Sequence, residues 1–510
     1  YFSAQILPMT DFSRNNLSGA TSPYLRQHQD NPIWWQEWNS ATLEHAKNAG
    51  KPLFVSIGYS TCHWCHVMAT EAFSDRKIAK YLNGNFVCIK VDREQRPDID
   101  QFAMSFLVKM HGSGGWPLNI FMTAHLRPFL ALTYAAPTPR HGMPSFIDIL
   151  KFAKEASLHG DEIPPYSIER HENDPQEETE IIHEILSAFD TGNGGFGGAP
   201  KFPPHCTLIF LASRYEAGAD HAVRAVLEKT LGAIMSRGLH DHLQGGFFRY
   251  CTDSEWTIPH FEKMLYDQAM LLWAFGASCK ALGNEGYSII CKKIIKCLEE
   301  TFRSEGGLYY SAHDADTGHE EGATYLWSMG ELSKILGPKE LSAFESVYDV
   351  QESGNFEGKN HLVKKQEPFL HQTEEKLLTE RRKRQQPFVD KKIVTEWNCL
   401  AGTGLLLCHR YTGNDGALEI AKRVYHAIIS GHYKNGSLAH SSLEGDIQEG
   451  EFLSDYASLL LFATYMHEET RSEEKLISEL LGKVLKFKKE LWIESKNPDF
   501  LEVVAQPFDQ

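Results

Sequence analysis

The sequence has no uninterrupted hydrophobic stretch of the length that a membrane-spanning helix needs, about 20 residues. It also has no excess of basic residues, because 51 lysines and arginines stand against 67 aspartates and glutamates, a formal net charge of -16. Such an acidic surface repels phosphate groups, so we expect neither a nucleic acid nor a membrane as a partner. The sequence therefore predicts a soluble protein, and its 510 residues exceed one ordinary hydrophobic core and predict several domains.

Cysteine is also sparse, with 10 in the whole chain. Apart from Cys62 and Cys65, the cysteines stand singly in apolar stretches, as Cys88, Cys279 and Cys408 do. This is typical of small buried hydrophobic residues and not of a disulfide framework. We therefore expect a reducing, cytoplasmic location. The chain begins without an initiator methionine, so the sequence leaves secretion or an organellar location open.

Cys62 and Cys65 form a Cys-x-x-Cys motif directly after the apolar stretch 52–58 and at the start of a helical pattern. At a helix N-terminus the partial positive charge stabilises a thiolate and lowers its pKa. Cys65 lies one helical turn further on, where it can resolve a mixed disulfide formed at Cys62. The motif predicts a redox pair for thiol–disulfide exchange.

The elements expected after the motif follow the order of a thioredoxin-like α/β domain over residues 1–165. The expected elements are strand 86–92, helix 99–110, strand 118–123, strand 128–134 and helix 145–159. A proline that starts a strand, as Pro117 does, donates no hydrogen bond to the sheet. We predict that the Trp116–Pro117 bond is cis, because cis bonds are essentially confined to proline, and that Pro117 packs beside the cysteine pair.

Three other interpretations of the cysteine pair stay open. Cys-x-x-Cys-His is also the attachment signature of c-type haem, although a strand–helix–strand context argues against it. With His63 and His66 the two cysteines could bind zinc, but no second Cys-x-x-Cys or His-x-x-x-His pair lies nearby to complete four ligands. The third interpretation is a structural disulfide. We expect no metal and no cofactor.

Beyond a proline-rich, charged linker at 166–178, the pattern is helical and is interrupted by glycine-rich corners that contain aromatic residues. Four corners, at 192–198, 244–250, 305–311 and 354–360, recur about every 50 to 60 residues, which indicates stacked helix pairs. We predict an (α/α) toroid over residues 179–510, of the six-hairpin glycosidase type but without its last hairpins. About ten helices are expected, whereas six hairpins need twelve. The charged segment 371–387 is expected to be a solvated surface helix.

The segment 238–267 contains the highest density of polar side chains. Pro259 is expected to open a helix with His260, Lys263 and Asp267 on one face. Imidazole and carboxyl groups beside aromatic rings suit acid–base chemistry on a sugar, although each group alone could equally cap a helix or a turn. Acidic clusters near 313–327 and 395–398 could face the same pocket. The candidate pocket residues are His240, Asp241, His242, Arg249, Asp253, Trp256, His260, Glu262, Asp267, Asp314, Asp316 and Glu396.

Several stretches of the chain together resemble the spermatogenesis-associated protein 20 family, in order from about Leu17 to Asp455. They are 17–38, 56–68, 90–100, 114–118, 194–203, 238–253, 259–267, 309–316 and 397–398. The resemblance implies a thioredoxin-like domain fused to an (α/α)6 toroid similar to six-hairpin glycosidases and N-acylglucosamine epimerases. It also implies that Cys62, Cys65 and Pro117 form the redox site and that Asp92 lies buried below the disulfide. The chain departs from the family pattern at Cys399, where a glycine is typical.

The sequence thus favours thiol–disulfide exchange, in which Cys62 attacks, Cys65 resolves and the helical ring binds the client or a glycan. The family name adds an expected role in spermatogenesis. The alternatives are a carbohydrate-modifying enzyme of the epimerase or hydrolase type, with the first domain as an accessory, and a binding scaffold without catalysis. The expected partner is accordingly a protein thiol or disulfide, or a small carbohydrate.

Overall fold

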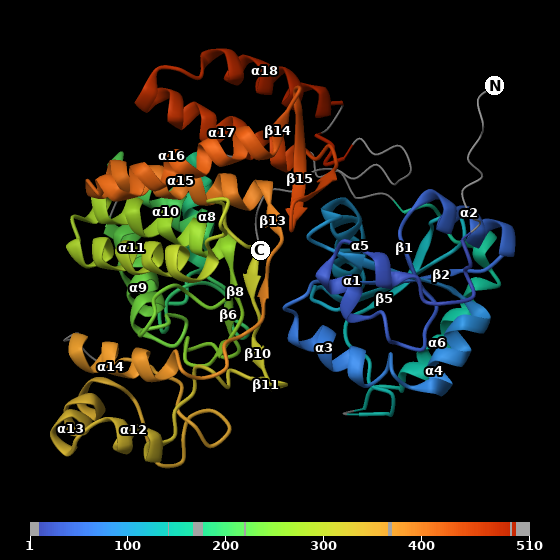
Figure 1. Cartoon of the computed structure of the whole chain (residues 1–510), viewed down its shortest axis with the longest axis horizontal. Coiled ribbons are helices and arrows are strands. Elements are labelled where there is room, and N and C mark those ends of the chain that lie inside the picture. The colour runs from blue at the N-terminus through green and yellow to red at the C-terminus, as the bar shows by residue number, and fades with distance from the viewer. Residues whose placement is uncertain are drawn as a thin grey trace. The chain divides into compact units, whose positions relative to one another are not determined.

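The computed structural model describes residues 10–140, 142–166, 177–218, 221–365, 370–489 and 492–495. These residues form two compact units, the first ending at 166 and including 493–495, the second running from 177 to 492 (Figure 1). Residues 167–176 of the predicted linker lie outside the described part of the chain. Among the described residues, no helix combines the length and the hydrophobicity that crossing a membrane requires.

The first unit contains a five-stranded sheet in the order β1-β3-β2-β4-β5. Strands β1, β2 and β3 are parallel, whereas β4 runs antiparallel to β2 and β5 antiparallel to β4. The central strands are buried on both faces, and this is why they read as continuous apolar runs in the sequence. The strands are β1 (Trp35–Glu37), β2 (Leu53–Gly58), β3 (Val87–Asp92), β4 (Leu118–Met122) and β5 (Pro128–Leu132).

Helices cover both faces of this sheet, because successive side chains of a strand point to opposite sides. Phe54 and Phe121 face a core shared with α1, α3, α4 and α6, whereas Val55 and Ile120 face a core shared with α2 and α5. All five elements predicted between 86 and 159 are present, which confirms the thioredoxin-like order. The helices are α1 (Pro23–Gln27), α2 (Ser40–Ala49), α3 (His63–Thr70), α4 (Arg76–Asn85), α5 (Pro97–His111) and α6 (Phe146–Ser157).

The second unit is built from helix pairs in two layers. In the inner layer, α8 packs against α10, α10 against α15 and α15 against α17. In the outer layer, α9, α11, α16 and α18 each follow and contact their inner partner, and α7 (Glu178–Ala188) contacts α9. Inner helices such as α10 are buried almost all round, as expected for helices covered on two sides. The inner helices are α8 (His205–Glu216), α10 (Leu265–Leu282), α15 (Thr395–Thr412) and α17 (Leu453–Thr470); the outer helices are α9 (His221–Ser236), α11 (Glu285–Cys297), α16 (Asp415–Gly431) and α18 (Glu474–Val484).

The glycine corners mark the passage from one helix pair to the next inner helix. Corners 192–198, 244–250 and 305–311, and a further glycine-containing corner at 434–440, all precede the next inner helix or the strands that lead to it. Corner 354–360 does not precede an inner helix in this way, so the prediction that it belongs to the repeat is wrong. It lies in an inserted lobe with its own core, formed by α12 (Met329–Ile335), α13 (Pro338–Val347) and α14 (His371–Arg381). Figure 1 shows these helices at one end of the helical unit. The described residues thus contain twelve α-helices after the linker, α7 to α18, and not about ten.

Short strands connect the corners. They occupy the place where the sequence predicted the start of a helix. No helix begins at Pro259: residues Pro259–His260 form β7, Lys263–Met264 form β8, and α10 begins only at Leu265. His260 pairs with Tyr250 of β6 (Tyr250–Cys251), and Lys263 pairs with His313 of β9 (Ala312–His313). Backbone pairing with distant segments therefore overrides the local helix signal, and His260, Lys263 and Asp267 do not share a helix face.

The remaining strands extend these connections. Strand β8 belongs to the three-stranded sheet β12-β9-β8, and β13 pairs with β15. Strands β12 and β13, which directly precede α15, therefore pair with segments that are distant in the sequence. The remaining strands are β10 (Asp316–Thr317), β11 (Glu320–Glu321), β12 (Val389–Asp390), β13 (Ile393–Val394), β14 (Tyr433–Lys434), β15 (Ser437–Leu443) and β16 (Asp446–Glu449).

Candidate functional site

The cysteine pair lies at the turn between β2 and α3. Cys62 is the N-cap residue of α3, where its Sγ accepts a hydrogen bond from the backbone N–H of Cys65 at 3.2 Å. The two cysteines form a disulfide, and their Cα atoms are 5.2 Å apart. Because Cys62 precedes the first helical residue, its sulfur lies where the unpaired N–H groups and the helix dipole favour negative charge. The structure thus places Cys62 at the helix start that the sequence predicted.

Pro117 directly precedes β4, the strand that pairs with β2, and β2 leads to Cys62. The Trp116–Pro117 bond is cis, which confirms the prediction. Leu118 of β4 pairs with Ile57 of β2, so the segments before Leu118 and after Ile57 emerge side by side. Trp116 is held by a hydrogen bond from its indole nitrogen to Asp100, 2.7 Å, and by the Arg93 guanidinium, 3.9 Å from its ring centre. The turn at Pro117 therefore lies at the same end of the sheet as the turn that carries the cysteines.

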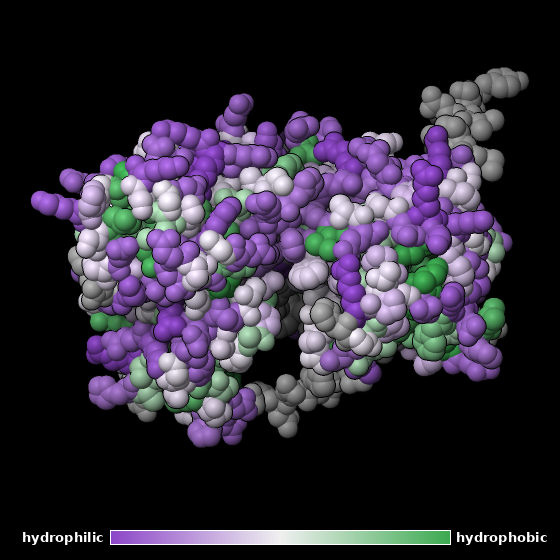
Figure 2. Space-filling model, turned by 90° about the horizontal axis from the view of Figure 1, so that it is seen from below, coloured by the Kyte–Doolittle hydropathy of each residue, from purple (hydrophilic) through white to green (hydrophobic). Residues whose placement is uncertain are grey.

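A groove of about 630 Å³ opens next to the motif. We call it the Trp64 groove, because Trp64, between the two cysteines, forms part of its wall and is 48 % exposed. Met143, Ile149 and Phe152 are among its apolar residues, and Met143 and Phe152 are largely exposed. Figure 2 shows hydrophobic patches (green) on the surface of the first unit. A concave surface of this size with apolar walls is a candidate binding site.

The predicted pocket residues of the helical unit take part in several buried contacts. Asp241, in the turn after α9, accepts hydrogen bonds from Lys263 (2.7 Å) and from both terminal nitrogens of Arg381 (2.8 Å each). Burial acts to raise the pKa of Asp241, but the two cations overcome it and hold this pKa well below its usual range. Asp241 is therefore an ionised structural residue that connects a corner to α14 of the lobe. The expectation that segment 371–387 is merely a solvated helix is thus wrong for Arg381, which is buried.

The two histidines that flank Asp241 bind backbone carbonyls. His240 Nδ1 lies 3.0 Å from the carbonyl oxygen of Met235, and His242 Nε2 lies 3.0 Å from that of Arg237. Burial lowers the pKa of both imidazoles well below 6.5, so both are neutral at physiological pH. Their contacts are those of groups that end α9 and order the following corner.

A second cluster of charged side chains lies on or next to the short strands. Arg249 donates a hydrogen bond to Glu262 at 3.1 Å, and both side chains are buried. His260 Nδ1 lies 2.6 Å from Glu321, and its Nε2 lies 3.7 Å from Glu262. The imidazole also stacks on Tyr250 with ring centres 5.1 Å apart. Three predicted pocket residues, Arg249, His260 and Glu262, are thus brought together.

The first residues of the inner helices carry further acids. His205 Nε2 of α8 lies 3.1 Å from Asp267 Oδ1 of α10, and burial raises the pKa of Asp267. The backbone N–H of Glu396, on α15, donates to Asp455 at 3.1 Å, and Asp455 also lies 2.7 Å from His440. Sequence reasoning missed His205, His440 and Asp455, because a single histidine or aspartate at a helix start carries no local signal of its partner.

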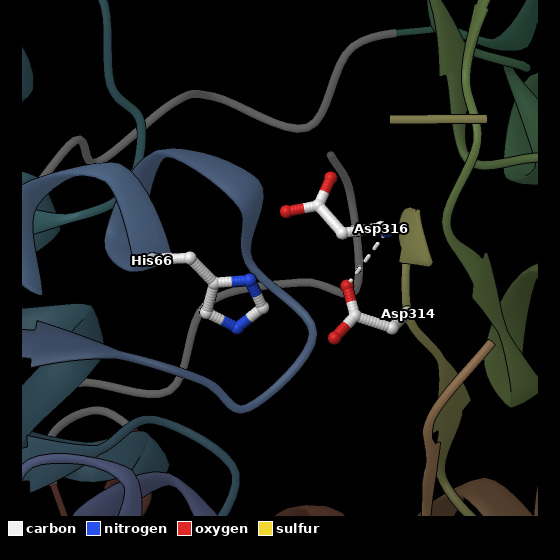
Figure 3. Close-up of side chains that lie close together, drawn as sticks. All are labelled: His66, Asp314 and Asp316. Atoms are coloured by element: carbon white, nitrogen blue, oxygen red, sulfur yellow. Dashed lines mark hydrogen bonds between the residues drawn. The ribbon is translucent and has the colours of Figure 1, made fainter. Parts of the chain in front are cut away.

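The other candidates order turns. Asp253 accepts hydrogen bonds from the backbone N–H groups of three residues, Glu255, Thr257 and Ile258. Trp256 is buried, and its indole donates to the carbonyl of Gly194 at 3.2 Å. Asp314 accepts a hydrogen bond from the backbone N–H of Asp316 at 3.0 Å, drawn as a dashed line in Figure 3. These contacts agree with the capping role that the sequence left open for each of them.

A thioredoxin-like unit with a disulfide at a strand–helix turn, followed by a domain of layered helix pairs, defines the class of this protein. Residues 14–163 match the Thioredox_DsbH family, described as a protein of unknown function, DUF255. Spermatogenesis-associated protein 20 of Mus musculus is 31 % identical over 91 % of this chain and 68 % of its own length. The human protein of that name is 33 % identical over 80 % of this chain and 60 % of its own length. An uncharacterized Caenorhabditis elegans protein is 35 % identical over 89 % and 71 %, respectively.

The chain belongs to the spermatogenesis-associated protein 20 family. It spans 60 % to 71 % of the length of these relatives. Among solved structures, a sugar epimerase from a ruminal bacterium aligns with 64 % of this chain and 92 % of its own, at 15 % identity and a TM-score of 0.33. A DsbH oxidoreductase aligns with 24 % of this chain and 85 % of its own, at 19 % identity and a TM-score of 0.19.

Proposed function

We propose that this protein carries out thiol–disulfide exchange on polypeptide clients through Cys62 and Cys65. The observation that carries the proposal is the position of Cys62 as the N-cap of α3, one turn before Cys65. The names of the human and mouse relatives associate the family with spermatogenesis, and we propose the same setting for this protein.

The exchange needs no group beyond the two cysteines and the client. The Cys62 thiolate attacks one sulfur of a client disulfide, a mixed disulfide forms, and the other client sulfur leaves as a thiolate that takes a proton from water. Cys65 loses its proton to water, its thiolate attacks Sγ of Cys62, and the second client sulfur leaves with the electron pair of the broken bond and takes up a proton from water. The client gains two electrons and two protons, and the protein ends in the Cys62–Cys65 disulfide form. In reverse, the same steps oxidise a client dithiol.

The Trp64 groove supports a polypeptide as the client. Trp64 belongs both to the Cys-x-x-Cys turn and to the groove wall, so an apolar segment bound there lies beside the reacting sulfurs. Both cysteines are buried in the disulfide form. Exchange therefore needs a local opening at the exposed Trp64 turn, and a bound client segment can stabilise this opening.

A redox titration tests the proposal. The protein is equilibrated in graded glutathione buffers and alkylated, and the peptide with Cys62 and Cys65 is quantified by mass spectrometry. We expect a midpoint of roughly -200 to -270 mV, the range from glutaredoxins to thioredoxin, because a helix N-terminus stabilises the reduced thiolate form. Cys206, which is partly exposed and forms no disulfide, serves as the internal control. A pair that stays oxidised below about -300 mV would be a structural disulfide and would contradict the proposal.

As a second candidate function, we propose carbohydrate binding or modification in the helical unit. Asp267 favours it, because this buried carboxyl has a raised pKa and lies beside the His205 imidazole, which makes an acid–base pair. Its Oδ2 makes no hydrogen bond with any described residue. The neighbouring rings of Tyr266 and Trp397, with centres 4.9 Å apart, could stack on a sugar.

Ligand-induced thermal stabilisation tests this second function. We expect hexoses or N-acylhexosamines to raise the melting temperature of the wild type but not of Asp267→Asn, which removes the acid. Glu320→Gln, a change at an exposed carboxylate, should keep the effect. If no sugar shifts the wild type, or if both variants respond equally, carbohydrate chemistry at Asp267 is ruled out.

A further inference from the structure

Tyr24 is a fully buried tyrosine of α1 with an unsatisfied hydroxyl. Its oxygen makes no hydrogen bond of normal geometry with any residue in the described ranges. A side-chain interaction with Ser56 acts to lower the pKa of Tyr24, but burial and the charge of Asp92 outweigh it. A buried O–H group without a partner costs free energy, about 1–3 kcal/mol. Such a group calls for an explanation in terms of another state of the protein.

The Tyr24 hydroxyl borders the same small space as the sulfur of Cys65. This space lies at Gly58, the last residue of β2, where the glycine has no side chain. A Cβ at Gly58 would lie 2.5 Å from the Tyr24 oxygen and 2.7 Å from Sγ of Cys65. Glycine is therefore needed at this position, because a methyl group would overlap both of these atoms.

The groups around Tyr24 keep its hydroxyl protonated. Burial, together with the negative charge of Asp92, raises the pKa of Tyr24 well above 10. Asp92 lies opposite Gly58 on β3 and accepts a hydrogen bond from Ser22 at 2.5 Å. The Lys90 amine lies 4.9 Å from the centre of the Tyr24 ring and donates to Ser56 at 2.9 Å.

The edge of the His28 ring completes these surroundings, with its centre 5.0 Å from that of the Tyr24 ring. Burial lowers the pKa of His28 well below 6.5, so this neighbour is neutral. The Tyr24 hydroxyl is therefore a fixed hydrogen-bond donor throughout the physiological range of pH.

We propose that the Tyr24 hydroxyl donates a hydrogen bond to Sγ of Cys65 when the Cys62–Cys65 disulfide is reduced. This inference rests on the proposed exchange function. In the disulfide form the sulfur is a weak acceptor and the donor stays unsatisfied, whereas the Cys65 thiolate accepts a stronger, charge-assisted bond. Tyr24 thus favours the reduced pair and stabilises Cys65 as the nucleophile that attacks Sγ of Cys62. Tyr24 keeps its proton, and the electron pair leaves with the client sulfur as described above.

Tyr24→Phe tests this role, because it removes only the hydroxyl. We expect the disulfide to become about tenfold more stable against glutathione, which corresponds to a midpoint about 30 mV more negative. In a Cys62→Ser background, alkylation of Cys65 should also require a higher pH when Tyr24 is replaced. Tyr81→Phe, a change at a half-buried tyrosine of α4, is the matched control and should leave both quantities unchanged.

The outcomes separate this inference from the proposed function. If the wild type exchanges disulfides and Tyr24→Phe behaves like Tyr81→Phe, the role of Tyr24 is overturned and the function stands. If the wild-type pair does not exchange, both fail. Should Tyr24→Phe not fold, the side-chain resonances of Tyr24 in the wild type give the answer. They should shift when the disulfide is reduced, and an unchanged resonance would contradict the hydrogen bond.

Discussion

Cys62→Ser is expected to abolish the capture of clients as mixed disulfides, whereas Cys65→Ser is expected to make such complexes accumulate. The reason is the position of the two sulfurs: Cys62 caps α3, where a helix N-terminus favours a thiolate, and Cys65 lies behind it in the first turn. Without Cys62 no covalent complex forms. Without Cys65 the complex forms but no thiol resolves it, so it persists until an external thiol attacks.

Incubation of each variant with an oxidised peptide, followed by non-reducing electrophoresis and mass spectrometry, measures this result. The covalent complex should be absent for Cys62→Ser and strongly enriched for Cys65→Ser relative to the wild type. Cys206→Ser, a change at a partly exposed cysteine outside the disulfide, is the control and should behave like the wild type. If neither active-site variant captures a client, thiol–disulfide exchange is not the function. If Cys65→Ser captures the peptide but the double variant Cys65→Ser/Cys206→Ser does not, the captured thiol is Cys206 and not Cys62.

Asp241→Asn is expected to destabilise the helical unit by about 3–5 kcal/mol, the usual cost of removing one partner from a buried ion pair. The change leaves the amine of Lys263 and the guanidinium of Arg381 buried, 1 % and 4 % exposed, without their carboxylate. Because Arg381 lies on α14, we expect the loss of stability to extend to the lobe as well as to the corner that precedes α10.

The same carboxylate predicts how stability depends on pH. The folded-state pKa of Asp241 lies well below its unfolded value, since Arg381 and Lys263 outweigh the effect of burial. Its stabilising contribution is therefore complete above the unfolded pKa of about 3.9 and is lost as the pH falls towards the folded-state value. Asp241→Asn should thus lower stability equally at pH 5 and pH 7 and differ less from the wild type below about pH 4.

Hydrogen exchange over α10 and α14 as a function of urea measures this effect, because it reports on the helical unit separately from the thioredoxin-like unit. Asp446→Asn, a change at an exposed aspartate of β16, should alter the free energy of unfolding by no more than about 0.5 kcal/mol. A loss below about 1 kcal/mol for Asp241→Asn would mean that the two cations find other partners and that the triad does not hold the lobe.

The thioredoxin-like unit could be predicted from the sequence nearly element by element. Its signals are local: buried strands read as apolar runs, Pro117 marks the start of a strand, and the cysteine spacing marks a helix start. Each of these features depends on neighbours within a few residues. The cis bond at Trp116–Pro117 was predictable for the same reason, since only proline makes that isomer common.

The helical unit could be predicted only in outline, as helix pairs separated by glycine corners. Its contacts join residues far apart in the chain, such as Asp241 with Arg381, 140 positions later. The helix expected at Pro259 failed because short strands there pair with Tyr250 and with β9. Hydrophobic periodicity reports which face of an element is buried but not which element covers it.

The sequence by itself determined the class of fold and the two residues that carry the proposed chemistry, because strand runs, helix starts and the Cys-x-x-Cys spacing are short-range properties of the chain. Only the tertiary structure decided which charged groups are paired and which remain unsatisfied. It brought the Tyr24 hydroxyl and the Cys65 sulfur together at Gly58, and it placed Asp241 between two cations. The physical reason is that desolvation and hydrogen bonding depend on every group within a few ångströms, and most of these groups come from distant parts of the sequence.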